Sequence, residues 1–118
     1  MRENIDLHRG TRVVPGYPDA PYGWDESEAR RLALEDGIEL TADHLEAIRS
    51  LQAYFAQHQE GAPHVRELHD ALDERFHQLG GIRYLYTLFP GGPVAQGCHL
   101  AGLPIPPGAR DSSFGSVQ

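Results

Sequence analysis

The one cysteine of this 118-residue sequence, Cys98, is the residue best suited to covalent chemistry. It lies within residues 84–104, directly after Gly97 and shortly after Gly91-Gly92-Pro93. Glycines open backbone conformations that other residues avoid, and prolines stop a helix from continuing. Such a segment can present a thiol at the surface, where reactivity follows pKa and exposure. The alternative is a small apolar residue packed against the body, and the residues alone favour neither.

The histidines do not favour a metal site. His64 and His69 are five residues apart, and His69 and His77 are eight apart. Helical zinc sites use an i, i+4 pair, and the sequence has no CxxC motif. We therefore expect solvated helix positions for most of the seven histidines, with no metal and no cofactor.

Composition favours a protein or small molecule as partner. The formal net charge is −7 and there is no lysine, whereas direct phosphate binding relies on clustered basic residues. A DNA-binding helix-turn-helix formed by the second and third helices is disfavoured, because acidic residues crowd residues 67–74, where a basic recognition face belongs. No apolar run approaches a membrane span, and the N-terminus lacks a secretory signature. One cysteine cannot form an internal disulfide, so we expect the reducing cytoplasm.

Hydrophobic spacing and helix punctuation predict four helices. Thr41 is the expected N-cap of the second helix, and Pro63 is expected in the first turn of the third. Glycines supply the stops. The expected boundaries are near residues 25–37, 41–61, 63–80 and 82–88.

The two ends of the chain, unlike its middle, are not predicted to be helical. Residues 1–23 contain a short β-prone run, 11–14, followed by Pro15-Gly16, which indicates a small hairpin. From Pro90 onward glycine and proline are dense, which predicts a mobile or wrapped arm without regular structure. We expect a single domain over 1–118: a hairpin region (1–23), a helical body (24–89) and an arm (90–118). The fold class is mainly α, a small bundle of about four to five helices.

Several motifs match a known family in order along the chain. The chain resembles the DsrC/TusE family of sulfur-relay proteins, also described as the gamma subunit of dissimilatory sulfite reductase, over roughly residues 16–108. The residues that carry the resemblance are Trp24, Asp25, Glu26, Ala29, Glu39-Leu40-Thr41, His44, Pro63, Arg66, Tyr84-Leu85-Tyr86, Leu88-Phe89-Pro90, Gly92-Pro93, Gln96, Cys98 and Ala101-Gly102-Leu103-Pro104.

The resemblance implies a small helical fold with an N-terminal β-hairpin and a flexible C-terminal arm that carries sulfur as a persulfide or trisulfide. It implies docking on a siroheme sulfite reductase or on the relay for tRNA thiolation. For this chain it implies a carrier acting through Cys98, rather than a self-contained enzyme. We expect Gly97, His99, Arg83 and Arg66 to serve partner docking.

The sequence departs from the family pattern at the principal thiol. Cys98 matches the family's inner cysteine, while the penultimate cysteine falls at Ala109. Leu45 also replaces a usual tryptophan, and Asp70 a frequent lysine. A two-thiol cycle within the chain is therefore excluded. Three hypotheses remain: a one-thiol sulfur carrier, a non-catalytic family member that docks on a relay partner or a sulfite-reductase-like complex and modulates it, and, as the weakest of the three, a DNA-binding regulator.

Overall fold

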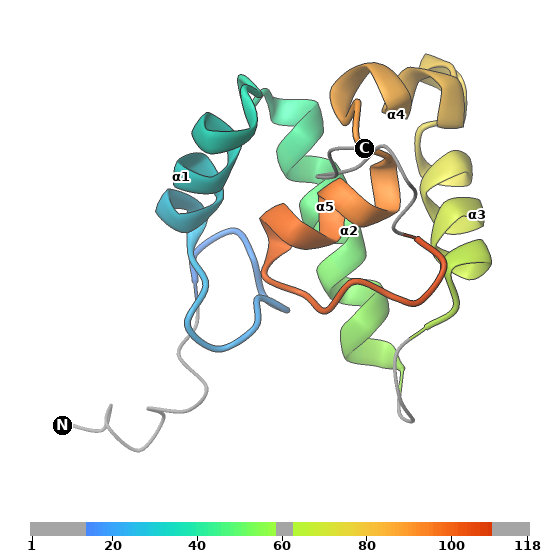
Figure 1. Cartoon of the computed structure of the whole chain (residues 1–118). Helices are drawn as coiled ribbons and strands as arrows, with labels where there is room; N and C mark the ends of the chain where they lie inside the picture. Colours follow the sequence, from blue (N-terminus) through green and yellow to red (C-terminus); the bar gives the residue numbers. More distant parts are fainter. Residues whose placement is uncertain (1–13, 59–62, 110–118) are drawn as a thin grey trace, which may run out of the picture.

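The computed structural model describes residues 14–58 and 63–109, and α-helices account for more than half of them (Figure 1). None of the helices in these ranges combines the length and the apolar character that a membrane span requires. This mainly helical architecture confirms the predicted fold class. In chain order the elements are α1 (Glu26–Asp36), α2 (Ala42–Gln57), α3 (Val65–Arg75), a 3-10 turn η2 (His77–Leu79), α4 (Ile82–Leu88) and α5 (Pro93–Ala101).

The first two helices begin where their capping residues predict. The Asp25 side chain accepts a hydrogen bond from the Glu28 backbone N–H, and Gly37 ends α1 in the left-handed conformation, with φ of 74°. Thr41 caps α2 by accepting from the backbone N–H of His44. The helix ends at Gln57, earlier than the expected Gly61, which lies outside the described residues.

The third helix is shorter than its apolar pattern suggested. Its N-cap is His64, so the prediction that places Pro63 inside the first turn is wrong. The helix ends at Arg75, and η2 connects it to Gly80-Gly81. Leu79, expected on the buried stripe, is 56% exposed because η2 departs from the helical period.

The predicted N-terminal hairpin is not supported. Residues 1–13, including most of the β-prone run, lie outside the described residues. Within residues 14–23 the chain forms turns, and a single bridge joins Val14 to Tyr17 without any strand. Pro15 lies inside this turn. It has no backbone N–H and therefore cannot donate a hydrogen bond to a neighbouring strand.

The largest correction concerns the expected arm. Residues 93–101, predicted to lack regular structure, form α5, and eight of its nine residues are buried. Pro93 is the first residue of the helix and Gly102 is its C-cap. Both are tolerated or preferred at these positions, so the glycine and proline density marks the two ends of a helix.

Helix α5 forms the centre of the molecule. It packs against α1, α2, α3 and α4. In Figure 1 it lies across α2, with α1 on one side and α3 and α4 on the other. The fully buried side chains of Ile48, Leu51, Leu68, Leu85 and Leu100 bring α2, α3, α4 and α5 into one core. The helix that carries Cys98 is therefore the element on which the others are packed.

Candidate functional site

The sulfur atom of Cys98 is packed in the core. The residue has 0% of its surface exposed and belongs to the same buried cluster as Ala101 and Phe89. The expectation that the surrounding glycines present this thiol at the surface is wrong for the described conformation. Loss of hydration raises the pKa of the Cys98 thiol to about 12, so the group is a neutral thiol at physiological pH. In this state Cys98 is a poor nucleophile.

Gly97 allows the close approach of α5 to α2. A Cβ atom built on Gly97 would lie 2.7 Å from Cδ1 of Leu51, which is itself 1% exposed. A contact that short is repulsive, and a well-packed core has no room to relieve it. Gly97 was expected to lower crowding for a docking partner, but it is buried and faces α2. The absence of a side chain at Gly97 therefore lets α5, which carries Cys98, lie close to α2.

Two side chains from other elements hold the end of α5. The indole Nε1–H of Trp24 donates to the carbonyl oxygen of Leu100 at 2.8 Å. The amide Nε2–H of Gln52, from α2, donates to the carbonyl oxygen of Ala101 at 3.0 Å. The last carbonyls of a helix lack partners within the helix, and a buried carbonyl without a donor is costly. Trp24 and Gln52 therefore fasten the C-terminal end of α5 to the body.

The backbone after α5 completes this capping. Gly102 adopts φ of 78°, and its N–H reaches the carbonyl of His99. The N–H of Leu103 donates to the carbonyl of Cys98 at 3.0 Å. This pair of bonds is a Schellman motif, which requires a residue with positive φ. All four terminal carbonyls of α5 therefore have donors.

The start of α5 is held by Gln96. Its side-chain oxygen accepts from the backbone N–H of Gly91 at 2.9 Å. Its side-chain nitrogen donates to Asp36, at the end of α1, at 3.3 Å. The turn before α5 and the end of α1 are thus joined through one buried glutamine.

His44 fixes the segment that leads into α5. Its Nδ1 accepts from the backbone N–H of Thr41 at 3.0 Å, so its Nε2 carries the proton and donates to the carbonyl of Leu88 at 2.8 Å. The ring also lies edge-on to Phe89, with centroids 5.1 Å apart. His44 is thus a neutral, buried connector between α2 and the end of α4.

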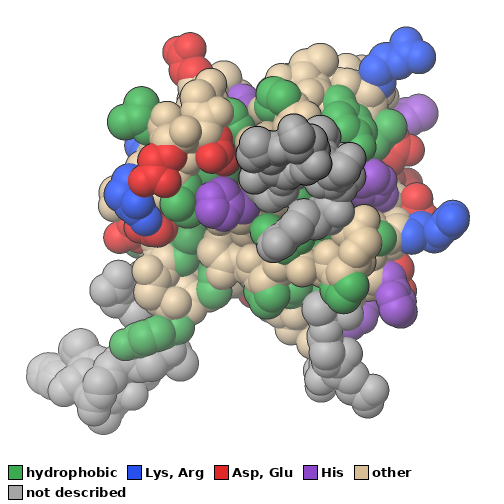
Figure 2. All heavy atoms as spheres, viewed as in Figure 1, with side chains coloured by type: hydrophobic (Ala, Val, Ile, Leu, Met, Phe, Trp, Pro, Cys, Tyr) green, Lys and Arg blue, Asp and Glu red, His purple; other side chains and the backbone are tan. Residues whose placement is uncertain are grey.

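The predicted docking residues lie on three different helices, and only Gly97 and His99 adjoin Cys98 on α5. His99 is half-buried on α5, while Arg66 on α3 and Arg83 on α4 are exposed. Arg66 lines a groove between α3 and α5, and Ala109, the position matched to the family's terminal cysteine, lines the same groove. The face shown in Figure 2 carries its arginine side chains near the margins, away from the middle. The thiol is therefore buried in the core, whereas Arg66 and Arg83 are exposed on other helices.

The segment after α5 returns to α3. Gly102 lies against Trp24, near α1, whereas Gly108 lies against Val65, on α3. A turn closed by the hydrogen bond from Ala109 N to Pro106 O, at 3.1 Å, ends this path. Figure 1 shows the segment crossing the molecule from the α1 side to the α3 side. Through Ala109 the chain therefore follows the body.

Sequence reasoning missed the residues that hold α5 against the body. Leu51 and Gln52 lie inside the predicted second helix, and nothing in their spacing indicates a partner 49 residues away for Gln52. Trp24 was noted as a motif residue, without its contact to Leu100. The available signal was the pairing of Pro93 with Gly102, which marks a nine-residue helix and hence the burial of Cys98.

Comparison with known proteins matches this architecture and its motifs. The model of the DsrC-like protein family matches residues 14–109. This chain belongs to that family. Sulfurtransferase TusE of Salmonella typhimurium is 38% identical over 92 residues, which cover 77% of this chain and 84% of that protein. Sulfurtransferase TusE of Yersinia pestis is 39% identical over the same length, with the same coverage.

A solved member of the DsrC-like family shares the fold. The NMR structure of Allochromatium vinosum DsrC superposes with a TM-score of 0.62 at 41% sequence identity, covering 72% of this chain and 76% of that chain. Among the described residues, no three histidine, cysteine or acidic side chains are grouped as a metal site would require.

Proposed function

We propose that this chain is a sulfur-relay protein that accepts sulfane sulfur on Cys98 and passes it on. The membership in the DsrC-like family and the identity of 38% to 39% with sulfurtransferase TusE proteins carry the proposal. Cys98 is the single thiol of the 118 residues, so a persulfide formed on this sequence forms there. The protein acts as a carrier within a complex, and its chemistry is completed by a partner.

The loading step conserves atoms and electrons. The Cys98 thiolate attacks the terminal sulfur of a donor persulfide, R–S–SH, and forms a new S–S bond. The S–S bond of the donor breaks, and R–S⁻ leaves and takes up the proton released by Cys98. The products are Cys98–S–SH and R–SH, and no external oxidant is needed.

This step requires α5 to move. In the described conformation the thiol has no exposed surface and its pKa is raised to about 12 by burial. Release of the end of α5 from Trp24 and Gln52 would hydrate the sulfur and bring its pKa back toward the ordinary value of 9.0. The proposal therefore includes a partner or a fluctuation that detaches α5.

The finer features of the pathway are proposals of the same kind. The partners are sulfur-transfer proteins or a siroheme sulfite reductase-like complex, in a reducing compartment such as the cytoplasm. A tRNA thiolation relay is the other branch in which such a carrier serves. Direct nucleic-acid contact is disfavoured by the net charge of −7.

Sulfur loading tests the proposal directly. The folded chain is incubated with glutathione persulfide, and its intact mass is measured with and without a reducing agent. We expect a gain of one sulfur atom that the reducing agent reverses, and no gain in Cys98→Ser or Cys98→Ala. A Cys98 that takes up neither sulfur nor iodoacetamide until the chain is denatured would contradict the carrier role.

A second function is favoured by one observation, the complete burial of Cys98. In that case the chain docks on a sulfur-relay partner and modulates it without carrying sulfur. Cys98→Ser separates the two functions. Loss of sulfur transfer with binding retained supports the carrier, and unchanged transfer supports the modulator.

A further inference from the structure

A groove on the α3 side of the molecule lies apart from the buried thiol. It has a volume of about 510 Å³ and lies where α3, the end of α4, the start of α5 and the last described turn meet. Its apolar lining comes from Val65, Tyr86, Val94, Ala95 and Ala109. Val94 and Ala95 are buried at 1% exposure and form the floor of the groove, whereas Tyr86 is 45% exposed. The apolar surface open to a ligand therefore comes mainly from Tyr86 and the half-buried Val65 and Ala109.

The six arginines within the described residues fall into two groups. Arg30, Arg31, Arg49 and Arg75 each pair with a glutamate. Arg66 forms no ion pair with another described residue, although the chain carries a net charge of −7. A guanidinium without a carboxylate partner keeps its full capacity for bidentate recognition.

Arg83 is the other arginine that forms no ion pair within the described ranges, but it does not line the groove. Arg66 lines the groove directly. Arg66 is therefore the one arginine of the groove lining as the structure describes it.

Asp70 sets a limit on what binds there. It lines the groove one helical turn after Arg66, together with His69. Its carboxylate repels an acidic ligand on its own side, so a ligand carboxylate fits only beside Arg66. The charge pattern thus favours a negatively charged group on the ligand and also fixes where that group lies, beside Arg66 and away from Asp70.

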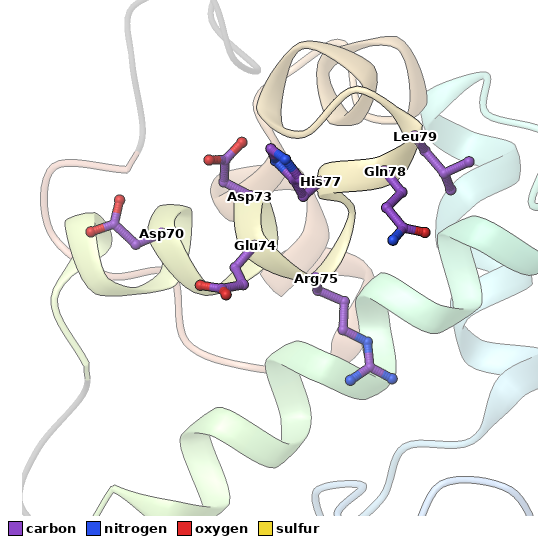
Figure 3. A pocket seen from close by; sticks show the side chains of 7 residues that line it. All are labelled: Asp70, Asp73, Glu74, Arg75, His77, Gln78 and Leu79. Atoms are coloured by element: carbon purple, nitrogen blue, oxygen red, sulfur yellow. The ribbon is translucent and has the colours of Figure 1, made fainter.

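A larger depression on α3 and η2 does not have these properties. It measures about 730 Å³ and is lined largely by polar and acidic side chains (Figure 3). The carboxylate of Asp73 accepts from the backbone N–H of Ile82, and Arg75 pairs with Glu46 on α2. In Figure 3 the Arg75 side chain extends toward α2, away from the acidic side chains. Asp73 and Arg75 in this depression thus already contact other parts of the fold, so we do not propose it as a ligand site.

We propose that the groove lined by Arg66 and Tyr86 docks an extended segment of a partner protein in which acidic residues alternate with apolar ones. The apolar side chains would contact Tyr86 and Val65, and a carboxylate would pair with Arg66. That the ligand is a protein follows from the proposed function. That its segment is acidic follows from charge complementarity with Arg66.

Peptide titration followed by NMR tests the docking site. The probe is a blocked five-residue peptide in which Asp alternates with Phe and Leu, added to the ¹⁵N-labelled full chain at low salt. We expect the backbone signals of Arg66, His69 and Ala95 to shift, and the affinity to fall as salt is added. Arg66→Gln should weaken binding about two- to fivefold, the range of a partly exposed ion pair. Asp70→Asn should strengthen it.

Arg30→Gln is the matched control, because it removes the same charge from an exposed arginine on α1. It should leave the affinity unchanged. Equal shifts with a peptide carrying Asn in place of Asp, or equal weakening by Arg30→Gln, would overturn the proposal. So would groove signals that shift with protein concentration alone, or in Phe114→Ala without peptide, since these identify a second copy or the chain's own C-terminal residues as the occupant.

The outcome is separable from that of the sulfur-loading test. Arg66→Gln should still take up sulfur from glutathione persulfide, because this small donor does not need the groove. Cys98→Ser should still bind the peptide. Failure of one property with retention of the other therefore identifies which proposal is wrong.

Discussion

Cys98 shows how strongly burial controls the chemistry of a thiol. The same residue type is a nucleophile when hydrated and an inert apolar group when packed. Here the packing is complete, with 0% exposure, and the pKa rises to about 12 because the thiolate would lose its hydration. The structure describes the packed state of Cys98, and a reactive state would require a second conformation in which the sulfur is hydrated.

This pKa shift predicts a loss of stability at alkaline pH. Below pH 9 the thiol is protonated in both the folded and the unfolded chain, so Cys98 adds no pH dependence. Above pH 9 the unfolded chain releases the proton and the folded chain keeps it, up to about pH 12. The free energy of unfolding then falls by about 1.4 kcal/mol for each pH unit.

Urea unfolding between pH 8 and pH 10 measures this effect. At pH 10 the wild-type chain should have lost about 1.4 kcal/mol through Cys98, and Cys98→Ala should lack this decrease. The upper limit of pH 10 matters because burial and hydrogen bonding also raise the pKa of Tyr17 and Tyr84 from 10.0. Parallel pH profiles of the two proteins would show that the thiol is hydrated in the folded state.

Helix α5 explains why the fold was predictable in part only. The starts of α1 and α2 follow from local capping by Asp25 and Thr41, which the sequence displays directly. The sequence also displays Pro93 and Gly102, but their composition alone resembles an irregular arm. Whether such a segment is a loop or a central helix depends on partners such as Leu51, far away in the chain.

The candidate site was predictable in the same partial way. A lone cysteine and a family resemblance identified Cys98, while its burial depends on packing that no local pattern displays. The contacts of Trp24 with Leu100 and of Gln52 with Ala101 span 76 and 49 residues. Hydrogen bonds to backbone carbonyls leave little trace in sequence spacing, because any residue supplies the acceptor.

The contact between α5 and α2 predicts a specific cost for Gly97→Ala. The new methyl group would lie 2.7 Å from Cδ1 of Leu51, in a region without free volume. Overpacking of a core costs about 1–3 kcal/mol, and the better helix propensity of alanine offsets about 1 kcal/mol. We expect a net destabilisation of up to about 2 kcal/mol in urea unfolding.

A double-mutant cycle identifies the contact responsible. Leu51→Val removes the Cδ1 atom, so the combined Gly97→Ala/Leu51→Val variant should lose less stability than the sum of the single changes. Strict additivity would mean that the Gly97 methyl group meets no resistance from α2, and that α5 is not held at close range.

The central position of α5 raises the question of how a relay partner reaches the thiol at all. Every other α-helix in the described ranges packs against α5, so full exposure of Cys98 could demand global unfolding. Yet the side-chain hydrogen bonds that cap its C-terminal end are only those from Trp24 and Gln52. Proteins open in cooperative units whose free energies lie below that of global unfolding. A relay role for Cys98 requires α5 to belong to such a unit.

The urea dependence of Cys98 alkylation distinguishes local from global opening. If α5 detaches locally, the labelling rate in low urea should rise with a slope well below the m-value of global unfolding. Trp24→Phe leaves the Leu100 carbonyl without its donor and should speed labelling about tenfold, or ~1.4 kcal/mol in opening free energy. Tyr22→Phe, at a position 77% exposed, is the control and should have no effect. A labelling slope equal to the global m-value in all three proteins would mean that the sulfur is reached only by unfolding the chain. That result would contradict the carrier function and leave the second proposed function, a protein that docks on a relay partner without carrying sulfur.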